Sequence, residues 1–260
     1  MKNIFTIVIS LMFVVGLAGM TYGAQMSLAG AWSFDEGAGK TVIDSVAGNN
    51  GELMGSTKFV AGGNFGGAVQ FPGKGDSYVI IPHKDYMDAD AYTFTVWTKL
   101  DVASWQYIAW KNGPVFPDQG AARHIDIWVH DEDYPVFMWS VEGGGDFVQL
   151  PGKTVIADGT WHHVAKWYDG KSIRMYIDGK LDVQADTEKL AKNGKDALWI
   201  GARPGDVAAT GIMDEVGFFT KALTENELKA VMNQSLTSLS AVDSSDKLST
   251  TWGDVKSKSK

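Results

Sequence analysis

Apolar and polar residues alternate with a period of two over residues 158–180, DGTWHHVAKWYDGKSIRMYIDGK. This period places successive side chains on opposite faces of a strand, so residues 161–168 and 172–177 are predicted as two strands. Asp169-Gly170-Lys171 between them suits a tight turn, because glycine adopts the positive φ that a short hairpin loop needs. Further Asp-Gly pairs open the first strand and close the second. The stretch therefore predicts a β-hairpin.

Short segments of the same kind recur along the chain, separated by turns rich in Gly, Asn and Asp. The other predicted strands are 31–34, 68–71, 78–82, 92–100, 106–111, 124–130, 136–141, 199–201 and 212–219. One short helix is predicted near residue 224, because Thr224 as N-cap and Glu227 three residues later form a capping box. With 260 residues and 30 glycines, the pattern favours one large β-sandwich.

Three motifs carry a resemblance to a known family. They are W-x-F-D-E-G-x-G from Trp32, the hairpin string D-G-T-W-H-H-V-A from Asp158, and G-x-M-D-E-V-x-x-F-x-x-A-L-T-x-x-E-L from Gly211. Over about residues 28–232 the chain resembles laminin-G-like jelly rolls of the concanavalin A-like lectin/glucanase superfamily. The resemblance implies an all-β fold, a two-sheet antiparallel jelly-roll sandwich with a short helix near the C-terminus.

The ends of the chain differ in composition from this domain, which is assigned to residues 25–232. Residues 1–24 combine Lys2, an apolar run and small residues at 21–24, which predicts a cleaved signal peptide and a secreted, periplasmic or cell-surface protein. The alternative is an uncleaved membrane anchor; if the peptide is cleaved, no membrane span is expected. Residues 233–260 are rich in Ser, Thr and Lys and predict a flexible tail, with a short amphipathic turn as the alternative.

Charge and cysteine content exclude some functions. The formal net charge is −8 and no basic stripe is present, which argues against nucleic acid as a partner. The chain has no cysteine, so it has neither a disulfide framework nor a thiol nucleophile. The acidic balance suits a protein that meets neutral ligands or divalent cations.

The predicted strand 124–130, HIDIWVH, has an unusual face. By alternation Ile125, Ile127 and Val129 enter the core, and the opposite face holds the candidate ligand-binding residues His124, Asp126, Trp128 and His130. We expect this second face to be at least partly exposed and to line a groove. A merely solvated polar face is the alternative, because polar outer faces are common in sandwiches.

A tryptophan in such a groove suggests carbohydrate or glycoconjugate as the ligand. Trp128 offers a flat apolar ring for the C–H face of a pyranose, while Asp126 and the imidazoles can bond hydroxyl groups. Trp105, Trp110 and Trp139 are further ring candidates, and Trp110 is the strongest of them because it shares one side of its strand with Gln106 and Ile108. The alternative partner is a protein, bound through the loops and the tail.

Catalysis and a metal ion are weaker interpretations of the same strand. Some superfamily glucanases carry E-x-D-x-x-E on the matching kind of strand, but here His124 occupies the first carboxylate position. Unless Glu142 or the acids at 131–133 supply a partner for Asp126, retaining hydrolysis has no carboxylate pair, so no enzyme is predicted. A metal held by His124, Asp126 and His130 would need a further ligand from an adjacent strand.

The resemblance also implies a structural calcium ion at a sheet edge. Asp214 is the first candidate ligand, and Asp35 and Asp76 are the next. Carboxylates are the hard oxygen donors that Ca²⁺ prefers. The alternative is that Asp214 only ties loop backbone amides together.

Overall fold

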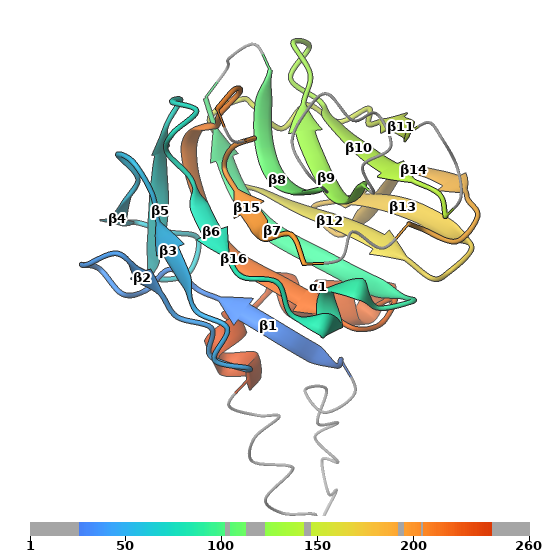
Figure 1. Ribbon diagram of the computed structural model, residues 1–260, viewed down its shortest axis with the longest axis horizontal. Helices are drawn as coiled ribbons and strands as arrows, with labels where there is room; N and C mark the ends of the chain where they lie inside the picture. Colours follow the sequence, from blue (N-terminus) through green and yellow to red (C-terminus); the bar gives the residue numbers. More distant parts are fainter. Residues whose placement is uncertain are drawn as a thin grey trace, which may run out of the picture.

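The computed structural model describes residues 26–101, 105–112, 123–142, 147–191, 195–203 and 205–240. The predicted signal peptide therefore lies outside the described residues, as does the tail from residue 241. Within the described part, two antiparallel sheets of eight strands each form a sandwich, which confirms the predicted fold class (Figure 1). No helix in this part of the chain is long and apolar enough to cross a membrane.

The first sheet, sheet A, is built around strands from both halves of the chain. Its order is β14 (Lys180–Asp186), β13 (Ser172–Ile177), β12 (His162–Tyr168), β7 (Tyr92–Leu100), β16 (Thr210–Phe219), β5 (Gly67–Pro72) and β4 (Lys58–Ala61). Strand β1 (Leu28–Trp32) pairs with β16, so the first and last strands of the chain are neighbours. This closure brings the N-terminal and C-terminal parts of the described chain together.

The second sheet, sheet B, holds the strand with the unusual face. Its order is β11 (Phe147–Pro151), β10 (Pro135–Ser140), β9 (Arg123–Val129), β8 (Gln106–Asn112), β15 (Leu198–Ile200), β6 (Val79–Ile81), β3 (Gly51–Leu53) and β2 (Thr41–Val42). Strand β9 thus lies between β8 and β10, and the chain 124–130 is a strand as predicted. A 3-10 turn, η2 (Asp85–Asp88), follows β6.

The predicted hairpin is present as β12 and β13. Val164 lies opposite Ile177 and Tyr168 opposite Ile173. The turn is stabilised by the Asp169 carboxylate, which accepts hydrogen bonds from the backbone N–H groups of Lys171 and Ser172 at 2.9 and 2.8 Å. Gly170 has the positive φ of +95° that motivated its assignment to the turn.

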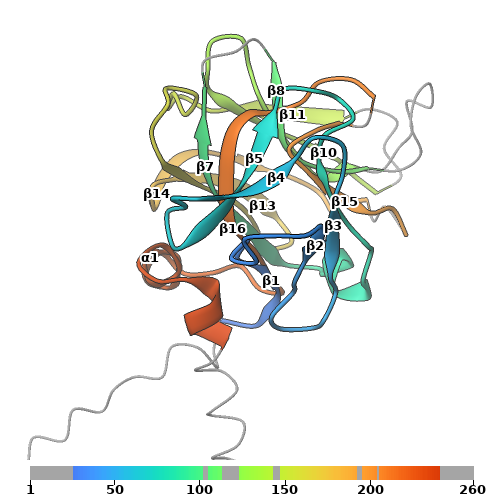
Figure 2. The same ribbon diagram turned by 90° about the vertical axis from the view of Figure 1, so that its left-hand side faces the viewer.

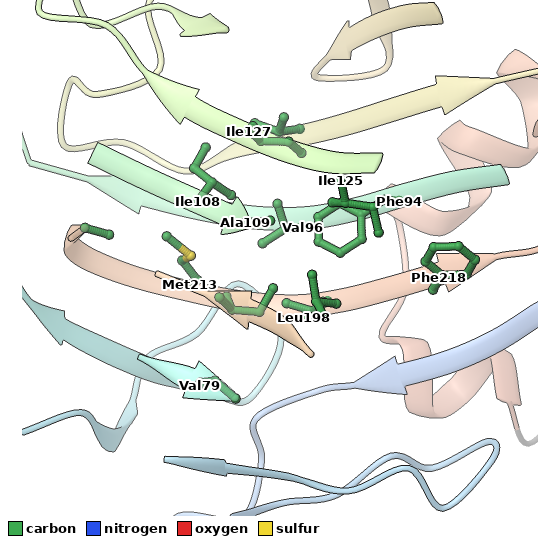
Figure 3. Close-up of a cluster of buried hydrophobic side chains, with 14 of the residues drawn as sticks. Val79, Phe94, Val96, Ile108, Ala109, Ile125, Ile127, Leu198, Met213 and Phe218 are labelled. Carbon is green, nitrogen blue, oxygen red and sulfur yellow. The ribbon is translucent and has the colours of Figure 1, made fainter. Parts of the chain in front are cut away.

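Apolar side chains of both sheets meet between the layers. Figure 3 shows Phe94, Val96 and Met213 of sheet A facing Ile108, Ile125 and Ile127 of sheet B. All of these side chains are fully buried. Burial of this kind contributes about 25 cal/mol per Å² of apolar surface, so this layer supplies most of the stabilisation of a chain without disulfides.

Helix α1 (Glu225–Met232) begins with the predicted capping box. The Thr224 hydroxyl accepts from the Glu227 N–H at 3.3 Å, and the Glu227 carboxylate accepts from the Thr224 N–H at 2.8 Å. Figure 2 shows α1 on the side of sheet A that faces away from sheet B. There Leu228 and Val231 pack in a second apolar cluster with Trp167 of β12 and Tyr176 of β13.

Packing continues beyond the expected domain end at residue 232. Residues 236–240 are helical, and Leu236 and Leu239 are buried in the same cluster as α1. The Leu236 N–H donates to the Glu215 carboxylate at 2.6 Å. The described packing therefore extends to residue 240, into the first part of the predicted tail.

Candidate functional site

The alternation predicted for β9 holds in its centre. Ile125, Ile127 and Val129 are buried in the core between the sheets. Trp128 lies on the opposite face, where it packs in a third apolar cluster with Tyr107, Trp110, Val136 and Met138. Asp126 lies opposite Trp110 of β8 and Met138 of β10 and shares their face. This outer cluster belongs to sheet B alone.

His124 departs from the alternation. The β8–β9 register skips it, since Lys111 lies opposite Ile125 and Asn112 opposite Arg123. The His124 ring is 4.7 Å from the ring of Tyr92, a core residue whose hydroxyl donates to the His124 carbonyl at 2.7 Å. The irregularity therefore turns His124 toward the core, and the prediction that it shares the face of Asp126 is wrong.

The predicted exposure of this face is also wrong for most of it. His124, Asp126 and Trp128 are 1 %, 0 % and 5 % exposed, and only His130 is partly exposed. For Asp126 and Trp128 the reason is that the outer face of sheet B carries aromatic and apolar neighbours that cover it, whereas a sandwich sheet often has a polar outer face. At the centre of β9, the side chains of Asp126 and Trp128 are therefore covered by other described residues.

The charge of Asp126 acts on a buried lysine. Lys166, on β12 of the opposite sheet, is fully buried and donates from Nζ to the Met138 carbonyl at 2.8 Å. Burial lowers the pKa of Lys166 to about 7, and the attraction of Asp126 opposes that lowering. The charge of Asp126 thus favours the protonated form of this buried lysine.

Trp105 is the exposed part of the predicted site. It directly precedes β8, is 48 % exposed, and stacks on Trp128 with ring centroids 4.6 Å apart and an interplanar angle of 13°. The position of the Trp128 indole is fixed by a hydrogen bond, which its Nε1–H donates to the Met138 sulfur at 2.8 Å. Trp105 has φ +41°, a conformation that a bulky side chain rarely adopts. A strained backbone that presents a half-exposed tryptophan is a feature of functional sites.

Two more rings extend this stack. His130 lies 5.8 Å from Trp105 and 5.7 Å from Trp128, and it stacks on Tyr134 at 4.9 Å with an angle of 5°. We call Trp105, Trp128, His130 and Tyr134 the aromatic platform. Tyr134 was missed in the sequence, although His130 and Tyr134 close the β9–β10 turn, where the His130 N–H donates to the Tyr134 carbonyl at 2.9 Å. Tyr134 could have been predicted from its position opposite His130 across the turn between the two predicted strands.

Trp110 and Trp139 do not join the platform. Trp110 is 5 % exposed and packs edge-on against Trp199, with centroids 6.0 Å apart and an angle of 83°. Trp199 in turn stacks on Tyr78. Trp139 is buried in the core between the sheets. The prediction that Trp110 is the strongest additional ring is therefore corrected in favour of Trp105.

Two of the acids considered as partners of Asp126, Glu142 and Asp131, contact other residues. Glu142 forms an ion pair with Lys189 at 3.0 Å, and both side chains are exposed. Asp131 contacts the His130 ring. In retaining hydrolases two carboxyl groups flank the glycosidic bond, and these contacts of Glu142 and Asp131 are to residues other than Asp126.

Two of the three calcium candidates converge on one loop. Asp214 of β16 accepts from the Phe65 N–H at 2.9 Å in the loop between β4 and β5, and Asp35 accepts from the N–H of Gly67, the first residue of β5, at 2.7 Å. Asp214 thus ties a loop amide in place, and the choice between this role alone and an added calcium ion stays open. Asp76 is not brought to this loop; its carboxylate accepts from the Ser77 hydroxyl at 2.8 Å in a different turn.

The pKa values of two carboxyl groups near that loop are raised. Burial raises the pKa of Asp214 to about 7, and repulsion by Asp35 adds to the shift. The neighbouring Glu215 is raised to a pKa of about 8 by burial and by the charges of Asp214 and Asp35. No group of three or more His, Cys, Asp or Glu side chains in the described ranges has the geometry to hold a metal ion by itself. Any cation here would need backbone oxygens from the loop as well.

The two adjacent histidines of the hairpin, His162 and His163, have separate roles. His162 bonds Asp178 through Nδ1 at 2.9 Å and the Thr160 hydroxyl through Nε2 at 3.1 Å. Its pKa is raised, first by the hydrogen bond to Asp178. His163 is buried edge-on against Trp97, and burial lowers its pKa to about 4. Both hold turns and packing together around the β12–β13 hairpin.

Comparison with known proteins places this architecture in a family. A family model described as Laminin_G_3, of the concanavalin A-like lectin/glucanases superfamily, matches residues 72–229, more than half of the chain. The chain belongs to this family. No curated protein matches the sequence significantly. The resemblance carried by the sequence motifs is thereby confirmed for the laminin-G-like jelly roll.

Solved structures show the same fold in proteins of distant sequence. The binding domain of Paraclostridial Mosquitocidal Protein 1 is similar with a TM-score of 0.61 and 14 % identity, over 80 % of this chain and 52 % of that one. Domain 4 of AbnA, an extracellular arabinanase from Geobacillus stearothermophilus solved with arabinotriose, is similar with a TM-score of 0.57 and 18 % identity. The match covers 80 % of this chain and 98 % of that domain. A Trypanosoma rangeli sialidase is similar with a TM-score of 0.59 and 12 % identity, over 79 % of this chain and 32 % of the sialidase.

The coverage differs among these structures. This chain spans about half the length of the mosquitocidal-protein domain and a third of the sialidase, but nearly all of the arabinanase domain. The fold is therefore shared by binding domains and by parts of enzymes. Its presence alone assigns neither role.

Proposed function

We propose that the chain is a non-catalytic binding domain that recognises carbohydrate or glycoconjugate through the aromatic platform. The observation that carries this proposal is Trp105, half exposed, stacked on Trp128 and presented from a strained backbone. A flat exposed indole suits the apolar C–H face of a sugar ring, and its support by a second ring gives a rigid contact surface. Rigid aromatic anchors lose little conformational entropy on binding.

His130 and Tyr134 supply the polar part of the proposed contact. An imidazole and a phenol hydroxyl beside an apolar ring can bond sugar hydroxyls while the ring packs on carbons. This combination of aromatic rings and polar groups is typical of ligand sites, which have an apolar surface and a few precisely positioned polar groups. The arabinanase domain of the same fold was solved with arabinotriose, which supports a saccharide as the ligand class here.

The proposal assigns no catalysis to the chain. Asp126 is buried, and Glu142 and Asp131 are paired with Lys189 and His130. A glycosidase of the retaining or inverting type needs two carboxyl groups across the scissile bond. We expect no release of reducing sugar from common polysaccharides. Release that disappears in Glu142→Gln or Asp126→Asn, in variants shown to be folded, would make the chain an enzyme.

Calcium is proposed as a structural ion at the Asp35–Asp214 loop. Both carboxylates face the same loop, their charges repel, and Ca²⁺ binds oxygen ligands from carboxylates and backbone carbonyls together. Export follows from the signal peptide predicted in the sequence, and the protein is proposed to be secreted, periplasmic or at the cell surface.

A glycan array tests the ligand class. The wild-type chain and Trp105→Ala are applied to the same array, with Ile43→Ala as the control because Ile43 is an exposed hydrophobic residue of similar exposure, 51 %. We expect a restricted set of glycans that bind the wild type and Ile43→Ala but lose at least tenfold in affinity with Trp105→Ala, about 1.4 kcal/mol. No glycan bound by the wild type, or equal binding by Trp105→Ala, would contradict the proposal.

A further inference from the structure

Three consecutive acids border the polar end of the aromatic platform. Asp131, Glu132 and Asp133 form the turn between His130 and Tyr134, whose rings are stacked on each other. Asp131 and Glu132 are exposed, and Asp133 is half-buried. We call these three residues the acidic rim. The rings and the carboxylates therefore belong to one continuous surface, which joins aromatic faces to negative charge.

Contacts within the turn hold two of the carboxylates next to the rings. Asp131 contacts the His130 imidazole, and the Glu132 N–H donates to His130 Nδ1 at 3.2 Å. Burial raises the pKa of the Tyr134 phenol, and Glu132, through its charge and a hydrogen bond, raises it further, as does the charge of Asp131. Negative charge thus acts on both polar rings of the platform.

The turn is anchored to the core, so the acidic rim has a fixed place. The Asp133 N–H donates to the His130 carbonyl at 2.9 Å, and the Asp133 carbonyl accepts from the Ile156 N–H at 2.9 Å. Ile156 is fully buried between the sheets. Asp133 has φ +65°, a left-handed conformation that aspartate adopts more readily than most residues. A preorganised surface of this kind loses little conformational freedom when a ligand binds.

The outer cluster of sheet B already holds one cation on an aromatic face. The Arg203 guanidinium lies 5.5 Å from the centre of the Tyr107 ring, and Tyr107 packs with Trp128. Arg203 also forms an ion pair with Asp206, so its charge is balanced within the chain. Cations are attracted to the negative face of an aromatic ring, most strongly to that of tryptophan. The half-exposed ring of Trp105 offers the same contact to a cation from outside the chain.

We propose that the aromatic platform selects saccharides that carry a protonated amine, which are amino sugars without an N-acetyl group. The inference rests on the proposed function, a saccharide bound at Trp105, and adds the charge of the ligand to it. The sugar ring packs on the indole, and its ammonium group meets the aromatic faces and the acidic rim. The ring centres of Trp105 and His130 are 5.8 Å apart, and Asp131 contacts His130, so one bound saccharide reaches both the indole and a carboxylate.

The same charges determine which saccharides are disfavoured. The chain has a formal net charge of −8, and the acidic rim repels a carboxylate or sulfate group on a ligand. A neutral saccharide keeps the contact with the indole but lacks the attraction to the rim. Affinity should therefore decrease from free-amine saccharides to neutral ones and again to those with uronic acids.

A glycan array with matched glycans tests this order. The glycans of a matched set differ at one position, which carries a free amine, an N-acetyl group or a hydroxyl, and uronic-acid glycans are added. We expect the full chain to bind free-amine glycans about tenfold more tightly than their N-acetyl forms. Raising sodium chloride from about 0.05 to 0.5 M should weaken the binding of the free-amine glycans, because salt screens exposed charges.

A charge variant tests the acidic rim itself. Glu132→Gln keeps the backbone N–H that His130 accepts, and it should weaken the binding of free-amine glycans about threefold and reduce their salt dependence. Glu52→Gln is the matched control, because Glu52 is an exposed glutamate of β3, which β15 and β6 separate from β8 in the same sheet. It should bind as the wild type does. A loss of salt dependence distinguishes a lost charge from a change in the shape of the turn.

The outcomes separate this inference from the proposed function. Binding of neutral or acidic glycans that depends on Trp105 and shows no preference for a free amine would reject the charge selection and leave the proposed function standing. Binding of no glycan would reject both. A tetralysine peptide bound as tightly as the best free-amine glycan would assign the platform to cationic peptides instead. If Glu132→Gln does not fold, free-amine binding by the wild type that is equal at both salt concentrations would still reject the acidic rim.

Discussion

At the scale of single residues, the carboxyl of Asp214 links stability to pH. Its pKa is raised to about 7 in the fold against 3.8 for the ordinary group, so the folded state binds a proton more tightly than the unfolded chain. Stability from this group is present at low pH and is lost as the pH rises from about 4 to 7. Glu215 adds a change in the same direction up to its pKa of about 8. The fold without a bound cation therefore loses stability toward alkaline pH.

Calcium should remove much of that loss. We expect the melting temperature in chelator to fall between pH 5 and pH 8, and millimolar calcium to raise it at pH 8 more than at pH 5, because a bound cation favours the ionised carboxylates. Asp214→Asn should abolish the calcium response, whereas Asp76→Asn, in a different turn, should keep it. Identical melting curves with calcium and chelator at pH 8 would reject the ion.

His162 acts in a neighbouring pH range through Asp178. The hydrogen bond to Asp178 raises the pKa of His162, so its stabilisation is full below pH 6.5 and disappears as the pH rises through the folded pKa. His162→Gln should therefore lose more stability relative to the wild type at pH 5.5 than at pH 8.5, by an amount of about 1 kcal/mol or less for a partly exposed pair. Urea unfolding at both pH values measures it, and an equal loss at both would show that the pair carries no charge-dependent stability.

Single residues also show where the sequence was insufficient. Alternation placed Ile125, Ile127 and Val129 correctly, because strand periodicity determines those positions. His124 was misplaced, since the register irregularity beside it depends on the partner strand β8. Trp105 is exposed on a backbone with a positive φ, and the pattern of residues around it in the sequence did not predict that conformation.

At the scale of elements, the capping box of α1 was predictable and its contribution can be measured. Helix α1 covers Trp167, whose indole N–H donates to the Leu223 carbonyl at 2.8 Å just before the cap. Thr224→Ala removes the acceptor of the Glu227 N–H and should cost about 1 kcal/mol of unfolding free energy. Thr237→Ala, at an exposed position, serves as the control. An unchanged urea midpoint for Thr224→Ala would show that the cap does not stabilise the domain.

Elements whose sequences carry strong turn chemistry were predicted well, and exposed edges were not. The β12–β13 hairpin and the start of α1 depend on local Asp-Gly and Thr–Glu spacing. Strands β11 and β14 escaped prediction because their exposed residues do not alternate cleanly. The covered outer face of sheet B is likewise a tertiary result, since Trp110 and Trp128 become buried only when β8, β9, β10 and β15 assemble.

At the scale of the whole molecule, the fold closes through both ends of the described chain. Strand β1 pairs with β16, and Leu236 and Leu239 pack beside Leu28 and Met26 in the α1 cluster. A chain truncated after residue 232 should lose about 3 kcal/mol or more, the burial of two leucine side chains, and leave Glu215 without its Leu236 partner. A chain truncated after residue 240 should melt close to the full chain. Equal thermal melts of the two truncations would contradict this boundary.

The whole-molecule function is tested most directly by following the tryptophan indoles during a sugar titration. The chain has 10 tryptophans, and each indole N–H gives its own signal in a ¹⁵N–¹H NMR spectrum. With a glycan selected on the array, we predict that the signals of Trp105 and Trp128, assigned through Trp105→Phe and Trp128→Phe, shift in proportion to saturation, while those of Trp110, Trp139 and Trp199 stay unchanged. Saturation that shifts other indoles and leaves Trp105 unmoved would show that the aromatic platform is not the binding site.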